Sequence, residues 1–219
     1  FENPSLLTSI EAFTFHKYSS LEQNTIVYNF LMRLLIKNGS LLYCSSLNQI
    51  TFPSSLESIG PYTFKGCVLF KKIDFLSSLN KINFVTSIEE YEFYKCSSLK
   101  QVLLENPSSV TIIGDNSFEK CSSLTQITFP SSLLLIQNLL LVMLALKEIE
   151  FEQNSALHVI GQNAFVDCNP LKHFEIPPSI ESIGNNAFNQ CTSLTTLRIP
   201  ASISINNIDL SSSTRISII

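Results

Sequence analysis

The chain contains 219 residues, of which 45% are hydrophobic and 15% are charged, and it carries a formal net charge of −4. The charged fraction is well below the usual quarter. The 14 lysine and arginine residues are scattered, whereas a nucleic-acid groove needs them clustered, so the composition argues against a nucleic-acid partner. The longest apolar tract, residues 139–146, is far shorter than the roughly 20 residues that span a bilayer, so no membrane span is predicted.

Residues 160–200 contain one pattern twice. Ile160-Gly161 is followed by Phe165, Cys168 and a segment that ends in Ile-Pro, and the same residue types recur from Ile183-Gly184 onward. The offset between the copies is 23 residues at every one of these positions. A fixed period of about 20–50 residues is typical of a solenoid, whose units cannot bury their own cores and therefore stack.

The template Ile-(x4)-Phe-(x2)-Cys-(x2)-Leu-(x2)-Ile-x-Phe/Ile-Pro places about eight units of 22–29 residues within residues 1–205. In chain order, the strand halves of these units are expected at residues 21–26, 47–52, 70–75, 99–104, 124–129, 146–151, 171–176 and 194–199. Alternating apolar and polar residues predict a half-buried strand in segment 124–129. Pro130 ends it, because proline cannot donate to a strand ladder. Residues 206–219 are expected to form a Ser-rich tail or a partial terminal repeat.

Units one and six depart from the template. Unit one has Tyr18 in the Cys slot and Ile26 as its strand residue, whereas unit six has Met143 in the Cys slot and is one residue short. The pattern is lost in residues 27–35 and 133–145 and recovers after each tract. A misread coding frame and ordinary divergence both account for this loss, and the coding DNA distinguishes them. A decayed fragment that folds only in part is a third interpretation.

Two further positions of the repeat predict its interior. One position keeps glycine in four units, at Gly60, Gly114, Gly161 and Gly184. Such a position is expected to need a positive φ or a close approach of two backbones. The phenylalanine four residues later is expected to enter the core, so that Phe118, Phe165 and Phe188 line up along one spine.

These residues resemble the leucine-rich repeat, and specifically its BspA-like (Treponema-type) class, whose consensus is LxxLxLPxxLxxIGxxAFxxCxx. Residues 171–177 and 183–191 match it almost letter for letter, and residues 124–130 match its strand half. The resemblance implies an α/β-type horseshoe solenoid. Such a solenoid has short parallel strands on its concave side, and irregular segments or short second strands on its convex side. It also implies an adhesion and binding role at a cell surface or in a secreted protein.

The six cysteines occupy one slot of the repeat, so stacking places them above one another inside the coil. Neighbouring units of a sheet lie about 4.8 Å apart, which allows disulfides between adjacent cysteines. The pairs would be Cys44/Cys67, Cys96/Cys121 and Cys168/Cys191. The slot also accepts Tyr18 and Met143, which favours free buried thiols that act as small hydrophobic groups.

No catalytic, metal or cofactor motif is present. The sequence lacks a CxxC pair, a His-rich cluster, a G-x-S-x-G motif, an HExxH motif, a P-loop and a dinucleotide fingerprint. None of the three histidines, His16, His158 and His173, belongs to such a motif. Isolated histidines of this kind are typical of a solvated repeat surface. We therefore expect no enzyme activity, no metal and no cofactor.

The outward positions of the strand halves are the candidate partner-binding residues. Units one to five place mostly Gln and Thr there, and units six to eight concentrate acidic residues. The candidates are Gln126, Thr128, Glu148, Glu150, His173, Glu175 and Arg198. We expect an acidic patch for a basic segment of a partner protein, with pH sensitivity through His173. The alternative is an ordinary solvated sheet face without an aromatic anchor.

The sequence therefore predicts a non-enzymatic protein-interaction or adhesion module of a cell-surface or secreted protein. The alternative is an intracellular structural or scaffolding segment without its own ligand. Asn38-Gly39-Ser40 is a glycosylation acceptor motif, which weakly favours a secretory route. Because the chain starts at Phe1 and no leader precedes its first repeat, we interpret it as a fragment of a longer protein.

Overall fold

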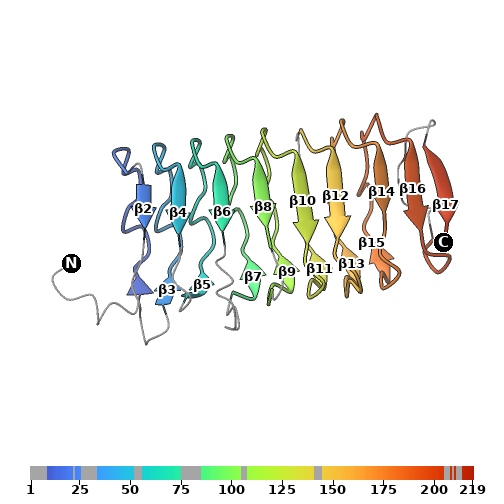
Figure 1. Ribbon diagram of the computed structural model, residues 1–219, viewed down its shortest axis with the longest axis horizontal. Coiled ribbons are helices and arrows are strands. Elements are labelled where there is room, and N and C mark those ends of the chain that lie inside the picture. The colour runs from blue at the N-terminus through green and yellow to red at the C-terminus, as the bar shows by residue number, and fades with distance from the viewer. Residues whose placement is uncertain are drawn as a thin grey trace.

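The computed structural model describes residues 9–21, 23–25, 34–51, 56–74, 85–104, 108–140, 145–204, 208, 210 and 214–219. Its repeat units follow one another in a single row from the N-terminus to the C-terminus (Figure 1). Each unit contributes a short strand to one sheet, then a turn segment, then a strand to a second sheet. We name these the minor sheet and the major sheet. The fold is a solenoid of short parallel strands, as predicted.

The major sheet forms two blocks, in each of which neighbouring strands pair in parallel. The first block contains β2 (Gln23–Thr25), β4 (Gln49–Thr51), β6 (Lys72–Asp74), β8 (Gln101–Leu103), β10 (Gln126–Phe129) and β12 (Glu148–Phe151). The second block contains β14 (His173–Glu175), β16 (Thr196–Ile199) and β17 (Arg215–Ile218). Strand β10 ends at Phe129, directly before Pro130, in agreement with the sequence prediction.

The minor sheet supplies the predicted short second strands, again in two blocks. The first block contains β1 (Ser9–Ile10), β3 (Leu34–Ile36) and β5 (Leu56–Ile59). The second block contains β7 (Ser87–Ile88), β9 (Ile112–Ile113), β11 (Leu135–Ile136), β13 (Val159–Ile160) and β15 (Ser182–Ile183). The described part of the chain contains no helix that is long and apolar enough to cross a membrane.

The turn segments add a third set of hydrogen bonds between units. In unit four the backbone N–H groups of Tyr91, Phe93 and Lys95 each donate, at 2.9 Å, to a carbonyl of unit five. The backbone is left-handed at the third and the seventh residue after the minor-strand isoleucine, as at Asn116 (φ +56°) and Lys120 (φ +63°). The left-handed residues turn the backbone so that N–H groups of the turn segment point along the row of units. Carbonyl groups of the neighbouring unit then accept these hydrogen bonds.

The interior is a stack of aromatic rings between the sheets. Phe64 and Phe93 lie 5.3 Å apart between ring centroids and Phe93 and Phe118 also lie 5.3 Å apart, both pairs nearly parallel. Phe165 and Phe188 stack at 5.4 Å. All five side chains are buried. The phenylalanine slot of unit six, at residue 141, lies outside the described residues.

The repeated glycine is explained by close approach rather than by a positive φ. A Cβ at Gly114 would lie 2.7 Å from the backbone nitrogen of Glu90 in the preceding unit, so a side chain does not fit. The left-handed backbone lies elsewhere in the repeat, and glycine occupies it only at Gly39 and Gly66. The sequence is compatible with a positive φ and with a close backbone approach, and the packing between units shows that the close approach is the reason.

One expectation for unit one is wrong. Asn24, not Ile26, stands in register with Ile50 of the next strand. Tyr18 lies in the Cys slot, since its N–H donates to the Phe15 carbonyl as the N–H of Cys44 donates to the Leu41 carbonyl, but its side chain is 56% exposed.

Most of the second irregular tract folds in register. Strand β11 pairs on both sides, with Ile112 and with Val159 opposite Leu135, and Leu133, Ile136 and Leu140 are buried. Residues 141–144 lie outside the described part, and so does the proposed place of Met143 in the Cys slot. In the first tract, only Leu34 and Leu35 are described, and both belong to β3.

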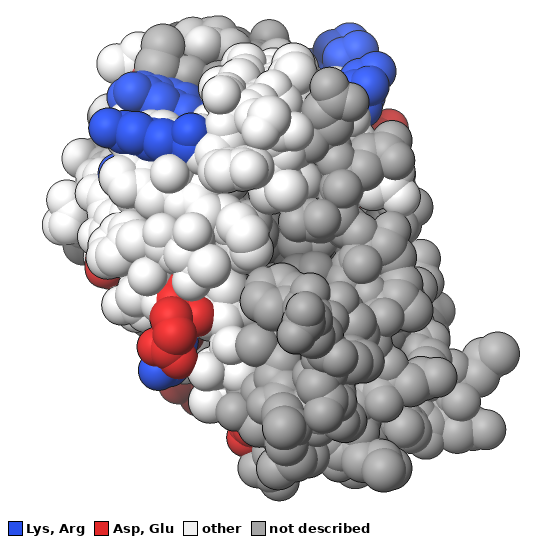
Figure 2. Space-filling model, turned by 90° about the vertical axis from the view of Figure 1, so that its left-hand side faces the viewer, with Lys and Arg blue, Asp and Glu red and all other residues white. Residues whose placement is uncertain are grey.

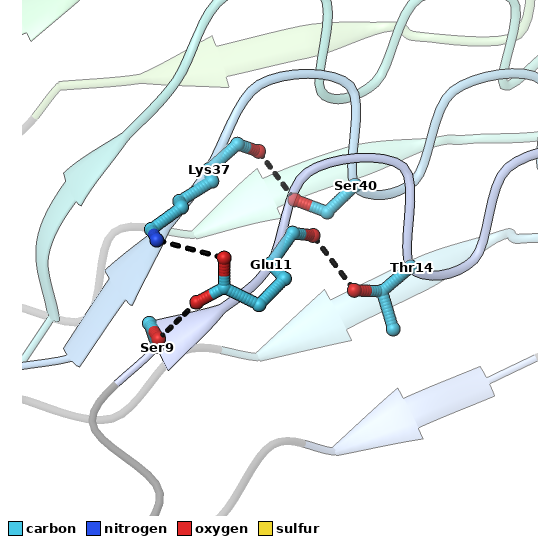
Figure 3. Close-up of polar contacts among 5 residues, drawn as sticks. All are labelled: Ser9, Glu11, Thr14, Lys37 and Ser40. Atoms are coloured by element: carbon cyan, nitrogen blue, oxygen red, sulfur yellow. Dashed lines mark hydrogen bonds and ion pairs between the residues drawn. The ribbon is translucent and has the colours of Figure 1, made fainter.

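Polar side chains join units one and two beside the minor sheet (Figure 3). The Lys37 ammonium donates to the Glu11 carboxylate at 2.7 Å, and the Ser9 hydroxyl donates to the same carboxylate. Both partners of the ion pair are about half exposed, so it contributes at most about 1 kcal/mol. The stacked interior therefore dominates the stability of the fold.

Phe118→Ala is expected to lower the free energy of unfolding by about 3–5 kcal/mol, because it opens a cavity within the ring stack. Urea unfolding followed by circular dichroism measures the loss. Leu134→Ala, at a side chain that is 40% exposed in the same region, is the control and should lower it by less than about 0.5 kcal/mol. A loss below about 1 kcal/mol at Phe118 would place it outside the core.

Candidate functional site

The seven candidate residues lie on the outer face of the major sheet, between β10 and β16. Gln126 stands opposite Glu148 and Thr128 opposite Glu150, whereas His173 stands opposite Thr196 and Glu175 opposite Arg198. Gln126 and Thr128 are half-buried, and the other five side chains are exposed. The strand register therefore aligns the candidates within each of two strand pairs, β10 with β12 and β14 with β16.

Within the described residues, the ladder of the major sheet stops between β12 and β14. Strand β12 is the last strand of the first block, and β14 is the first strand of the second. The inward side chains of β12 are consequently less covered than those of its neighbour. Ile149 and Phe151 are only half-buried, whereas Ile127 and Phe129 of β10 are fully buried. An apolar strip is therefore open to solvent at this interruption.

The loop after β12 is two residues longer than the loop after β10. Phe151 and Leu157 are six positions apart, whereas the equivalent Phe129 and Leu133 are four apart. Asn154 accommodates the extra length in a left-handed conformation, with φ of +58°. The loop remains tied to the preceding unit, because the Ser131 N–H donates to the Glu152 carboxylate at 2.8 Å. The longer loop forms one wall of a depression beside β12.

Two open hollows adjoin β12, and both are lined by Ile149 and Glu150. The first has a volume of about 650 Å³ and is also lined by Lys147, Glu148, Lys172 and His173, which makes it mixed in charge. The second has a volume of about 680 Å³, and we name it the acidic hollow. Its charged lining is entirely acidic and its apolar lining is partly aromatic: Glu150, Glu152, Glu175, Ile149, Phe151, Pro177 and Pro178.

The carboxylates of the acidic hollow have weak, exchangeable partners. The Arg198 guanidinium donates to Glu175 at 2.8 Å, with both side chains about half exposed. The Thr128 hydroxyl donates to Glu150 at 3.4 Å. Exposed ion pairs contribute about 0–1 kcal/mol, so a basic group of another molecule can replace these contacts at little energetic loss.

Sequence reasoning missed the apolar part of this site. Side-chain alternation in segment 146–151 places Phe151 in the interior, and the candidate residues include no aromatic anchor. Phe151 packs on Phe129 and Phe174, at 5.3 and 5.9 Å between ring centroids, while part of it faces the hollow. Two features of the sequence indicate an irregularity near Phe151: unit six lacks one residue, and the loop after residue 151 is two residues longer. Neither feature shows that the ladder of the major sheet stops after β12.

The thiols belong to the interior rather than to a reactive site. All six cysteines are buried, and none of them forms a disulfide. The thiols of Cys96, Cys121 and Cys191 donate to the carbonyl of the phenylalanine in the preceding unit, at 3.0–3.1 Å. Burial raises the pKa of Cys67, Cys96 and Cys121 well above the ordinary value, so these groups remain thiols. The slot thus selects a small group that donates one hydrogen bond.

Glu92 is a buried carboxylate in a slot that holds Ser, Thr or Ala in several other units. It is 1% exposed, and burial raises the pKa of its carboxyl well above the usual range. One oxygen accepts the Glu89 N–H at 2.9 Å, whereas the other has no partner. The described residues contain no cluster of three potential metal ligands, at Glu92 or elsewhere. The burial of Glu92 therefore lowers the stability of the folded protein.

Glu92→Gln is expected to stabilise the protein at pH 8 by about 1–3 kcal/mol and to change little at pH 4. The raised pKa of Glu92 means that the folded chain binds more protons than the unfolded chain above about pH 4.5, so wild-type stability falls as the pH rises through this range. Urea unfolding at both pH values tests this, with the exposed Glu181→Gln as control. A variant that is less stable than wild type at pH 8 contradicts it.

Thiol titration tests the role of the cysteines. At neutral pH the folded protein, purified without reductant, should show no fast-reacting thiol towards Ellman's reagent, because all six thiols are buried and inaccessible. In guanidinium chloride all six should react. No reactive thiol in the denatured protein would instead indicate three disulfides.

Comparison with known proteins places this geometry in a wider group. The family model described as "BspA type Leucine rich repeat region (6 copies)" matches residues 1–85 and 86–216. The leucine-rich repeat protein of T. pallidum is similar, with 21% identity, a TM-score of 0.53, and coverage of 80% of this chain and 68% of that one. A leucine-rich repeat protein from Eubacterium ventriosum has 20% identity, a TM-score of 0.52, and coverage of 84% and 40%. No curated protein matches the chain.

Proposed function

Because the chain belongs to the BspA-type leucine-rich repeat family, we propose that it is a non-enzymatic module that binds another protein at a cell surface or outside the cell. The family points to a protein-interaction repeat in general terms. The acidic hollow beside β12 carries the specific proposal, because it combines a half-exposed aromatic ring with three carboxylates. An exposed Asn38 in the motif Asn38-Gly39-Ser40 is compatible with passage through a secretory route.

The partner segment that fits the acidic hollow is basic and apolar in alternation. An extended strand directs successive side chains to opposite faces, so one face can place Lys or Arg near Glu150 and Glu175. An apolar side chain can cover Phe151 and Ile149, which removes their exposed surface from water. Aromatic anchors surrounded by polar groups are typical of the residues that dominate binding energy. The charges then contribute association rate and selectivity.

A second candidate function is a structural segment inside a larger intracellular protein, without its own ligand. The observation that favours it is that none of the six cysteines forms a disulfide, since disulfides are rare in reducing compartments. The hydrogen bonds from thiols to backbone carbonyls supply a packing reason for these cysteines in any compartment. The two candidates differ in whether the acidic hollow binds a matching peptide.

A fluorescent ten-residue peptide of alternating Lys and Leu is expected to bind the protein, with Glu150→Gln weakening binding about three- to tenfold. Higher salt should also weaken binding, since Glu150 is exposed. Fluorescence anisotropy measures the dissociation constants, and Glu181→Gln is the control with the same loss of charge. Equal weakening by both variants, or no binding at low salt, would contradict a specific role of the hollow.

A further inference from the structure

The turn segments of units three to five carry a cluster of tyrosines and lysines that the repeat does not require. It consists of Tyr62, Lys65, Tyr91, Tyr94, Lys95 and Lys120, and we name it the Tyr–Lys patch. Each side chain of this patch is half-buried or exposed. The patch belongs to the turn segments and not to the major sheet, so it is separate from the acidic hollow.

The tyrosines form a rigid platform. The rings of Tyr62 and Tyr91 stack at 5.3 Å between centroids with planes 9° apart, and Tyr94 meets Tyr91 edge-on at 5.5 Å. The Lys65 ammonium lies 4.8–5.1 Å from all three ring centroids. Lys95 and Lys120 lie 5.3 and 5.2 Å from the ring of Tyr94. Three ammonium groups are therefore gathered over one aromatic surface.

Two of these cations are available to an outside ligand. Among the described residues, Lys65 and Lys95 have no carboxylate partner, and their contacts are with aromatic rings. Lys120 pairs with Glu119 at 3.2 Å and donates to the Tyr94 hydroxyl at 3.0 Å. Glu90 borders the patch and is hydrogen-bonded to the Tyr62 hydroxyl. In Figure 2, which views the N-terminal end, basic side chains lie at several separate places on the described surface, and one of them touches an acidic group.

The backbone disfavours the two tyrosines at their positions. Tyr62 and Tyr91 occupy the first left-handed slot of the turn segment, at φ of +62° and +53°. The same slot holds asparagine or glycine in four other units and the bulky Phe13 and Leu139 in two, and asparagine tolerates left-handed backbone far better than a bulky aromatic residue. The two tyrosines are not fully buried, so packing into the core does not explain them. Residues in disfavoured conformations are concentrated at functional sites.

We propose that the Tyr–Lys patch binds an acidic polypeptide segment of a partner protein, laid along the row of units three to five. Lys65, Lys95 and Lys120 come from three successive units, which are spaced about 4.8 Å apart in a sheet. An extended chain places same-side residues about 6.7 Å apart, so two carboxylates can reach this row of ammonium groups. The tyrosines supply contact area with few rotatable bonds, as they do in antibody binding sites.

A polypeptide fits the patch better than a nucleic acid does. A nucleic-acid backbone presents a continuous row of phosphates and needs a matching row of cations. Here Glu90 and Glu119 interrupt the positive charge, and arginine, which binds phosphate through two parallel hydrogen bonds, is absent from the patch. Discrete carboxylates on one face of an extended segment match ammonium groups that are separated by tyrosine rings. This inference goes beyond the proposed function and does not depend on the acidic hollow.

The test uses two fluorescent ten-residue peptides, one of alternating Glu and Leu and one of alternating Lys and Leu. The Glu/Leu peptide should bind, and binding should be at least about tenfold weaker in Lys65→Gln/Lys95→Gln, the size expected of a central contact. The double variant Lys100→Gln/Lys172→Gln removes two exposed lysines outside the patch and should change binding little. Equal weakening by the two double variants would overturn the proposal.

Tyr91→Asn separates binding from folding. It installs the residue that units five, seven and eight carry in this slot, so the thermal melt should be unchanged or higher, and binding of the Glu/Leu peptide should be lost. Undiminished binding would overturn the proposal. So would tighter binding of a 20-residue single-stranded oligonucleotide or of heparin with the same dependence on Lys65 and Lys95. Binding of the Lys/Leu peptide reports on the acidic hollow alone, so the two proposals can fail separately.

Discussion

The structure depends on the in-register hydrogen bonding of each unit to the next. A strand of two to four residues cannot satisfy its own backbone, and a single phenylalanine cannot bury itself. Three parallel sets of backbone hydrogen bonds, in the major sheet, the minor sheet and the turn segments, align successive units. This alignment places Phe93 on Phe118 and brings each slot cysteine against the carbonyl of a preceding phenylalanine. Stability then arises from contacts between neighbours, as expected for a quasi-one-dimensional array.

The same constraint explains which positions are restricted. Gly114 lacks a side chain because the backbone of unit four passes directly over it. The Cys slot favours a small donor, because the buried thiol donates to a carbonyl of the preceding unit that already accepts one backbone N–H. Positions that face outward experience neither constraint. The outer columns of the major sheet and the surface of the turn segments can therefore vary from unit to unit, and differences in chemistry accumulate there.

The two candidate surfaces arise at different departures from the regular unit. At β12 the major-sheet ladder stops and the following loop is longer, which leaves Phe151 half-exposed between carboxylates. In units three and four, tyrosines occupy left-handed slots that favour asparagine, and they gather lysines from three units. One surface is acidic and the other basic, so they would select partner segments of opposite charge. A rigid row of units keeps such surfaces at fixed positions without a conformational change.

The sequence by itself determined the repeat, the parallel strands, the buried phenylalanines and the outward columns, because these follow from a fixed period and from side-chain alternation. It therefore placed Glu150, Glu175 and Arg198 on one face. Only the tertiary structure decided what the period does not encode. The reason for Gly114, the exposure of Tyr18, the interruption beside Phe151 and the meeting of Tyr94 with Lys65 all depend on distances between units. Such distances arise from stacking residues about 25 positions apart, and no local pattern in the chain specifies them.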